Sequence, residues 1–354
     1  MDLDELREKI DGIDEEIVRL INRRAEIAHE IGKLKADEGD SVYKPHRERA
    51  VLEHAEEAST GPMAEESIRA VFREIMSGCI ALEKPVKVAY LGPEGTFTHW
   101  AARSKFGDSI IYEPVPSLEE VFEEVERGRV DYGVVPVENS TEGGIRETLA
   151  RMVESPLKVC AEIVYAIEHA LMARCPLEDI ERIYSKGTVF GQTRRWLREH
   201  LPGIDRIEVA STAQAAEKAE QEQGAAAIGH AGMATLHELD VLFDGIQDRA
   251  DNETRFFVLG EHASAPTGDD KTALLCAVKD RAGALRDLLD PFKHYGINMT
   301  KIESFPAPGA GWEYYFFIDF VGHPEQERTV EALDEMEKQC NMLKVLGAFP
   351  RKAG

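Results

Sequence analysis

An apolar seam at heptad spacing runs from Leu3 to Leu34. Its members lie three or four residues apart, with one gap at position 24: Leu3, Leu6, Ile10, Ile13, Ile17, Leu20, Ile27, Ile31 and Leu34. This spacing predicts one continuous helix that carries all of these side chains on a single stripe. A helix of roughly 34 residues is about 50 Å long at 1.5 Å per residue. A single small domain cannot cover such a rod, so the seam predicts an intertwined dimer in which a second copy packs against it.

The seam opens an all-helical first domain, which we place at residues 1–84. The segment from Gly39 to Lys44 interrupts the long helix, and Pro45 begins a second, shorter one. The turn Thr60-Gly61-Pro62 separates that helix from a third, which ends near Glu83.

The rest of the chain predicts two further domains. Residues 86–262 alternate β-branched runs (VKVAYLG, DYGVVPV, LKVCAEIVYAI, AAIG, RFFVLG) with helical stretches such as LEEVFEEVERG and STAQAAEKAEQ. This alternation is typical of α/β domains and predicts largely parallel sheets. A linker at residues 262–270 leads to residues 271–350, which follow the order strand, helix, strand, strand, helix, strand. That order is the ferredoxin-like α+β arrangement.

Composition restricts the partners and the compartment. The chain has 42 Lys and Arg against 66 Asp and Glu, a net charge of −24. Such a surface repels phosphate backbones and anionic lipid, so we expect no nucleic-acid partner and no membrane partner. The N-terminus is charged where a signal peptide would be apolar. The 5 cysteines are scattered and form no CxxC pair, which disfavours disulfides and thiolate zinc sites and predicts a cytoplasmic location.

Position 24, the gap in the seam, is occupied by Arg24. A cation on a buried stripe is costly unless an anion faces it, either an acidic side chain or a bound ligand. Three more cations, Arg7, Lys35 and Arg47, lie beside the seam or in the second helix. Arg24 and Lys35 are about 16 Å apart along the axis, so they could bracket a small dianion. Arg7 is about 25 Å from Arg24 and would have to serve a pocket completed by another chain.

The pattern LREKI, L-I-x-R-R, E-I-G-K-x-K and R-E-R resembles the all-helical chorismate mutases over the whole first domain. The resemblance implies the pericyclic rearrangement of chorismate to prephenate. It places Arg24, Lys35 and Arg47 on the substrate's carboxylates and ether oxygen, with Arg7 from the partner subunit, and Glu48 on the ring hydroxyl. Catalysis would then consist of selecting a compact conformer and stabilising charge on the breaking ether bond.

Two residues depart from that pattern. Lys44 stands where relatives often have Asp, and Glu83 stands where many have Gln. A carboxylate would oppose negative charge developing on the ether oxygen, whereas a carboxylic acid could donate to it. We therefore hypothesise that Glu83 acts in its protonated form beside the dianionic ligand. The alternative is a solvated residue at the end of a helix.

Three polar strings adjoin strands of the α/β domain: Gly92–Thr98, Val134–Ser140 and Asn252–Phe256. Loops at strand ends bind ligands in α/β proteins, although turn and capping chemistry explains each string singly. The sequence contains no GxGxxG fingerprint, no GxxxxGK phosphate loop and no HExxH motif. We therefore expect chemistry without a cofactor and without a metal.

Together the strings resemble prephenate dehydratase, most diagnostically in Thr254-Arg255-Phe256. The resemblance implies two subdomains arranged like a periplasmic binding protein, with prephenate in the cleft losing water and carbon dioxide. Thr254 would donate a proton to the leaving hydroxyl, and Arg255 would hold a carboxylate. The other residues implied for the cleft are Thr96, Glu138, Asn139, Ser140, Ser185 and Gln192. Lys186 replaces a His of the family, and we interpret His99 and His230 as structural.

Residues 271–350 resemble an ACT domain, a module that binds amino acids at subunit interfaces. The turn Gly283-Ala284-Leu285 and the pair Glu303-Ser304 match its ligand-contacting positions, with Phe305 where Arg is usual. The resemblance implies feedback inhibition by phenylalanine. The alternative is a domain used only for dimerisation.

The three resemblances follow one another in pathway order and predict a bifunctional enzyme that is a homodimer or higher oligomer. Its small molecules would be chorismate, prephenate and phenylalanine. Two alternatives remain from the sequence: a regulatory binding protein with decayed catalysis, and a dehydratase acting on arogenate. A mutase joined to a prephenate dehydrogenase is excluded by the missing dinucleotide fingerprint.

Overall fold

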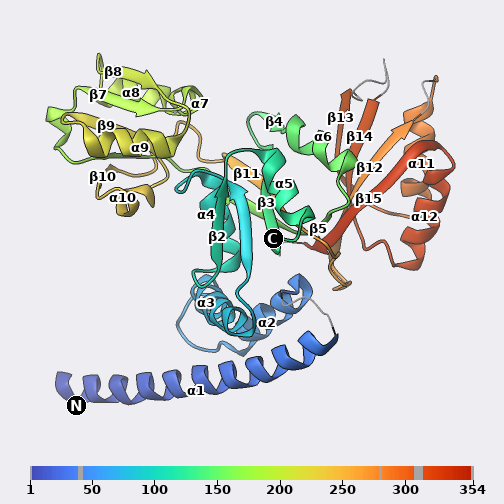
Figure 1. Cartoon of the computed structure of the whole chain (residues 1–354), viewed down its shortest axis with the longest axis horizontal. Coiled ribbons are helices and arrows are strands. Elements are labelled where there is room, and N and C mark those ends of the chain that lie inside the picture. Colours follow the sequence, from blue (N-terminus) through green and yellow to red (C-terminus); the bar gives the residue numbers. More distant parts are fainter. Residues whose placement is uncertain (1, 39–42, 279–280, 307–313, 352–354) are drawn as a thin grey trace. The chain divides into compact units, whose positions relative to one another are not determined.

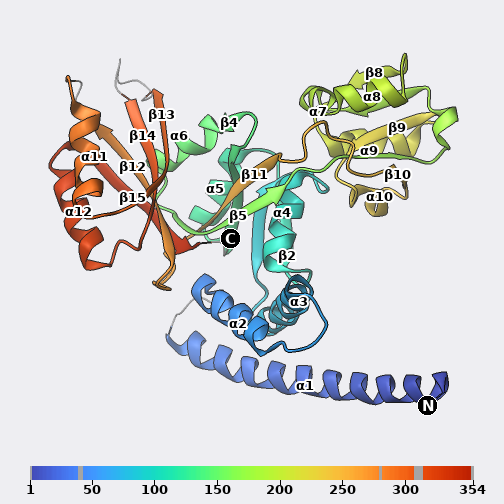
Figure 2. The ribbon, with the colours of Figure 1, turned by 180° about the vertical axis from the view of Figure 1, so that it is seen from behind.

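The computed structural model describes residues 2–38, 43–278, 281–306 and 314–351, without the side chains of residues 35–38. The chain divides into two compact units. One comprises residues 1–87 and 105–111, and the other residues 88–104 and 112–354. Figures 1 and 2 show the ribbon from opposite sides. Among the described residues, no helix combines the length and the apolarity that crossing a membrane requires.

The first unit is helical, as the sequence predicts. Its helices are α1 (Leu3–Glu38), α2 (Pro45–Ala58) and α3 (Glu65–Glu83), and residues 105–111 of the following domain belong to the same unit. Pro45 starts α2 at the position where its missing N–H costs nothing. Helix α3 packs against both other helices and buries Met76, Ser77 and Cys79. All nine seam residues of α1 remain 43–68% exposed in the single chain, so the stripe is formed but not covered.

The second unit begins with a lobe built on a six-stranded sheet. Its path runs β2 (Ile111–Val115), β1 (Lys87–Leu91), β3 (Tyr132–Asn139), β11 (Glu253–Gly260) and β5 (Lys158–Ala166), and β4 (Gly143–Gly144) pairs with β3. The helices of this part of the chain are α4 (Phe97–Phe106), α5 (Leu118–Glu126) and α6 (Arg146–Glu154).

The second lobe is inserted between β5 and β11. Its five-stranded sheet has the order β10 (Asp240–Phe243), β6 (Ala170–Ala173), β9 (Ala225–Gly229), β7 (Arg182–Ser185) and β8 (Asp205–Glu208). Its helices are η1 (Leu177–Asp179), α7 (Gly187–Gln192), α8 (Arg194–His200), α9 (Thr212–Gln221) and α10 (Met233–Leu236).

The prediction of largely parallel sheets is wrong. Strand β11 runs antiparallel to both β3 and β5, and β6 runs antiparallel to β9 and β10. The reason is the insertion: β5 leads the chain out of the first lobe and β11 brings it back, so the two neighbours must run in opposite directions. The parallel pairs include β1 with β3, and β7 with β8 and β9.

The C-terminal domain has the predicted ferredoxin-like order. Its sheet runs β13 (Met299–Pro306), β14 (Tyr314–Val321), β12 (Asp270–Val278) and β15 (Cys340–Pro350), with helices α11 (Ala284–His294) and α12 (Glu327–Glu337). Both views place the two helices on one face of this sheet and the first lobe on the other.

A continuous apolar core joins this sheet to the first lobe. Phe257 of β11 contacts Phe317 of β14 and Phe349 of β15, with ring centroids 6.0 and 5.9 Å apart. The backbones approach so closely that a Cβ on Gly347 would lie 2.1 Å from the Val159 carbonyl oxygen. The C-terminal sheet is therefore packed directly on the strands of the first lobe.

Candidate active sites

The helical unit contains a pocket of about 790 Å³ lined by α1, α2, α3 and the segment Lys105–Phe106. Four of the residues predicted from the sequence, Arg24, Arg47, Glu48 and Glu83, lie in its lining. Six lining residues are Arg or Lys and two are Glu: Arg23, Arg24, Lys44, Arg47, Arg73, Lys105, Glu48 and Glu83. Six minus two leaves the lining at +4 in a chain of net charge −24. The pocket suits a small dianion.

Arg24 points into this pocket from α1. Its Nη1 donates to the Cys79 Sγ at 3.0 Å. Within the described part of the chain Arg24 pairs with no carboxylate. Of the two anions that could face it, an acidic side chain or a bound ligand, the residues that the structure describes do not provide the first. The guanidinium is available for an anionic ligand.

Glu48 and Glu83 are held by neighbours. The Glu48 Oε2 accepts from the Tyr43 hydroxyl at 2.8 Å and pairs with the Lys105 Nζ at 2.5 Å. Glu83 lies across α1 at Gly32, where a Cβ would stand 2.7 Å from the Glu83 Cγ. Any larger residue at position 32 would force Glu83 to move from this place.

Of the other two predicted cations, Arg7 does not reach the pocket, and Lys35 cannot be placed in it or outside it. Arg7 lies near the start of α1, about 25 Å from Arg24 along the axis, and its Nη1 is 3.2 Å from the Asp4 Oδ1. Lys35 belongs to α1, but its side chain lies outside the described residues.

In the second unit, Thr254 is the centre of a row across the first sheet. Thr254 of β11 is in register with Asn139 of β3 on one side and with Tyr165 of β5 on the other. Residues directly opposite one another in a sheet share a face. The Asn139 Nδ2 donates to the Thr254 Oγ1 at 2.9 Å.

The orientation of Asn139 determines what Thr254 can do. The Asn139 Oδ1 accepts from the backbone N–H groups of Thr141 and Glu142 at 2.9 and 3.2 Å, so the amide NH₂ must face Thr254. Because the Thr254 oxygen accepts that bond, its own O–H hydrogen remains to be donated. This is the state that a proton donor requires.

Tyr165 meets a histidine of the second lobe. Its hydroxyl lies 2.9 Å from the His230 Nε2, and the His230 Nδ1 accepts from the Gly232 backbone N–H at 3.0 Å. The ring stacks on Trp100 at a centroid distance of 4.6 Å. Burial lowers the pKa of His230 to about 4, so the ring is neutral near pH 7 and its Nε2–H donates to Tyr165.

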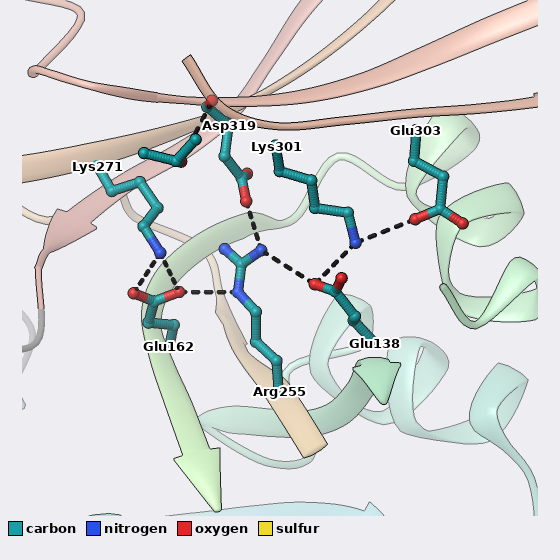
Figure 3. A network of polar contacts seen from close by, with 8 residues as sticks. Glu138, Glu162, Arg255, Lys271, Lys301, Glu303 and Asp319 are labelled. Carbon is teal, nitrogen blue, oxygen red and sulfur yellow. Dashed lines mark hydrogen bonds and ion pairs between the residues drawn. The ribbon is translucent and has the colours of Figure 1, made fainter. Parts of the chain in front are cut away.

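Arg255 and Glu138 differ from the expectation that they line a cleft with Thr254. Successive residues of a strand point to opposite faces, and both side chains lie on the face away from Thr254. The Arg255 Nε is 2.8 Å from the Glu162 Oε2, and its Nη1 pairs with Asp319 of the C-terminal domain. Glu138 pairs with Lys301 of that domain at 2.8 Å. Figure 3 shows both residues in this network.

Four other predicted cleft residues make bonds of their own. The Thr96 and Ser185 hydroxyls donate to the carbonyls of Leu91 and Ile228, and Ser140 bonds to the backbone on both sides of Asn252. The Gln192 Oε1 lies 2.7 Å from the Nε2 of the buried His169. His99 accepts the Gly95 N–H and stacks on Tyr90, in keeping with its structural interpretation.

In the C-terminal domain, Gly283 adopts φ +83° immediately before α11, with Ala284 buried and Leu285 exposed. Glu303 pairs with Lys301 at 3.0 Å on the face toward the first lobe, whereas Ser304 is exposed. Phe305 is buried in the shared core, so it packs there instead of occupying an exposed interface. Helix α11 covers the opposite face, so one chain does not bring Glu303 to the Gly283 turn.

Comparisons with known proteins find the same three domains in the same order. Residues 6–84 match the family model chorismate mutase type II, residues 88–264 match prephenate dehydratase, and residues 272–338 match the ACT domain. The chain is 42% identical over 353 residues to a bifunctional chorismate mutase/prephenate dehydratase of Pseudomonas aeruginosa, covering 98% of this chain and 97% of that one. It is 45% identical to the protein of the same name from Aquifex aeolicus, covering 99% and 98%. The chain belongs to the bifunctional chorismate mutase/prephenate dehydratase family.

A solved structure supports the fold of the second unit. The prephenate dehydratase of Arthrobacter aurescens, solved in complex with L-Phe, has a TM-score of 0.69 and 33% identity, covering 75% of this chain and 90% of that one. The protein is therefore an enzyme with mutase and dehydratase domains, and its C-terminal region is an ACT domain.

Several residues beside the predicted sites carry no signal of their role in the sequence. Lys105 reaches Glu48 from a helix of the following domain, so no pattern within residues 1–84 could reveal it. Tyr165 lies in a run that predicts a strand, but its place beside Thr254 depends on the register of that strand. Lys301 and Asp319 lie in the ACT domain and carried no signal of a link to the dehydratase.

Proposed function

We propose that the helical pocket rearranges chorismate through Arg24, Arg47, Glu48 and Glu83, with Lys35 on the same helix. The net positive lining supports this proposal because chorismate carries two carboxylates. Arg7 would complete the pocket of the partner subunit, since it lies too far from Arg24 to serve its own. The exposed seam of α1 supports the same intertwined homodimer.

For the dehydratase, Thr254 is the proposed proton donor. The observation that carries this assignment is the bond from Asn139, which leaves the Thr254 hydrogen to be donated. As the ring carboxylate leaves as CO₂, its bonding electrons enter the ring and expel the hydroxyl, which takes a proton and departs as water. Thr254 recovers its proton from solvent. The product from prephenate is phenylpyruvate, and the choice of prephenate over arogenate is part of the proposal.

The ACT domain is the proposed site of feedback inhibition by phenylalanine. The relative solved with L-Phe supports this assignment. Gly283, Ala284 and Leu285 would contact the effector together with Glu303 and Ser304 of a second copy, since Glu303 and the α11 turn lie on opposite faces of one sheet. We also propose a cytoplasmic location, from the cysteine usage.

The first test is a product time course from chorismate alone, with and without phenylalanine. We expect phenylpyruvate to form and to form more slowly with the effector. Thr254→Val should let prephenate accumulate, while Thr254→Ser, which keeps the hydroxyl, should retain activity. Phenylpyruvate formation by Thr254→Val at the wild-type rate would refute the role of Thr254. Unchanged chorismate would refute the function of the helical pocket.

A further inference from the structure

Two adjacent residue pairs lie on opposite faces of the dehydratase sheet. At the ends of β3 and β11, Thr254 is in register with Asn139, and Arg255 is in register with Glu138. The first pair carries the proposed donor, and the second pair lies on the other face. The register between β3 and β11 shifts immediately after Arg255, so the end of β3 is not held to β11 by an unbroken ladder, whereas β11 stays in regular register with β5 from Glu253 to Val258. Side chains on the far face can therefore influence how Asn139 presents Thr254.

Those side chains are held by the ACT domain. The Lys301 Nζ lies 2.8 Å from the Glu138 Oε2 and 3.0 Å from the Glu303 Oε2. Asp319 pairs with the Nη1 of Arg255. In Figure 3 these contacts form a chain from Glu303 to Lys301, to Glu138 and to Arg255.

The network continues to Glu162 of β5. Its carboxylate bonds to the Arg255 Nε at 2.8 Å and to the Lys271 Nζ at 2.7 Å, so Arg255 is bound on a third side. The complete network has three cations and four carboxylates: Arg255, Lys271, Lys301, Glu138, Glu162, Glu303 and Asp319. Three of these residues belong to the dehydratase lobe and four to the ACT domain.

The network is buried enough for its geometry to matter. The side chains of Asp319, Glu162 and Arg255 are 1%, 5% and 10% exposed, and that of Lys301 is 12% exposed. Removing one partner leaves a charge that water cannot solvate fully, so the remaining groups must move or re-pair. The apolar core around Phe257 and Phe317 keeps the two sheets together while such a change occurs.

We propose that Lys301 and Asp319 of the ACT domain are positioning residues of the dehydratase reaction. Through Glu138 and Arg255 they hold the ends of β3 and β11 at which Asn139 orients Thr254. Lys301 also pairs with Glu303, which we propose to contact the effector, so an event at Glu303 reaches β3 through two ion pairs and β11 through a third, between Glu138 and Arg255 at 3.9 Å. The inference rests on the proposed role of Thr254.

The test uses the full-length enzyme with Lys301→Met, which keeps the length of the side chain and removes its charge. Lys338→Met is the matched control, because Lys338 is an exposed residue of the same domain. We expect Lys301→Met to lower the dehydratase kcat about tenfold with KM changed less than twofold, because a small displacement of a catalytic group slows the reaction more than it weakens binding. Lys301→Arg should recover most of the kcat. The mutase rate from chorismate serves as the internal measure of folded protein.

A double-mutant cycle shows whether Lys301 acts through Glu138. If it does, Lys301→Met combined with Glu138→Gln should be no slower than Glu138→Gln alone. Asp319→Asn, nearly isosteric, provides a second variant should Lys301→Met fold poorly, with the same expected fall in kcat. A kcat equal to that of Lys338→Met in both variants, or effects that simply multiply in the cycle, would overturn the positioning role. Activity in Thr254→Val would instead overturn the role of Thr254, so the two failures are distinguishable.

Discussion

Replacing Gly32 by Ala tests how strongly the mutase depends on the position of Glu83. The added Cβ would lie 2.7 Å from the Glu83 Cγ, 3.0 Å from its Cβ and 3.2 Å from its Cδ. Carbon atoms in contact normally keep about 3.5–4.0 Å, so Glu83 must move by roughly 0.8 Å or more. A displacement of about 1 Å can cost about 100-fold in rate. We expect the mutase kcat to fall by about that factor, or about 2.7 kcal/mol of activation free energy.

The fold should withstand this change. Ala in place of Gly stabilises a helix interior by about 0.8–1.0 kcal/mol, while moving Glu83 off its rotamer costs about 0.5–1.5 kcal/mol. The two nearly cancel, so the thermal midpoint should change little. Gly12→Ala, in the same helix, is the control, because no described atom lies within 4 Å of its added Cβ.

The assay follows chorismate consumption, with dehydratase activity on added prephenate as the internal standard and thermal unfolding as the measure of stability. Folded Gly32→Ala protein with the mutase rate of Gly12→Ala would refute the argument. It would mean that Glu83 does not contribute to the rearrangement from its position beside α1.

Two further predictions concern the dimer and pH. Arg7→Ala and Arg24→Ala should each abolish mutase activity, and mixing the two variants under conditions of subunit exchange should restore part of it; no recovery would mean that each pocket uses one chain. Burial lowers the pKa of His230 from 6.5 to about 4 in the folded protein. As the pH falls, the unfolded chain therefore binds this proton at a higher pH than the folded protein does. Stability that is present above about pH 6.5 should therefore be lost between pH 6.5 and 4, on the order of 2 kcal/mol after allowing for partial exposure. Denaturant unfolding at pH 7 and 4.5 measures this loss, which should shrink in His230→Gln; equal losses in both proteins would contradict it.

Local patterns in the chain predicted the elements of the fold well. The heptad seam predicts α1, and Pro45 predicts the start of α2, because helix period and capping depend on residues a few positions apart. The alternation of runs predicts the ferredoxin-like order of the ACT domain for the same reason. These helices and strands can be predicted because the pattern that specifies each of them lies within one segment of the chain.

The sequence motifs predict which residues are functional, and the structure shows which of these residues lie next to one another. Arg24, Arg47, Glu48 and Glu83 converge on one pocket as expected. Thr254 and Arg255 are adjacent in the sequence, yet they point to opposite faces of β11 and have different neighbours.

The physical reason is that strand pairing joins segments far apart in the chain. Which strand lies beside β11, in which direction and in which register, depends on packing of the whole sheet, and a shift of one residue would exchange the two faces. The residue types of the Thr254-Arg255 motif come from the sequence alone. That Thr254 meets Asn139 while Arg255 binds Asp319 of another domain is a property of the tertiary structure.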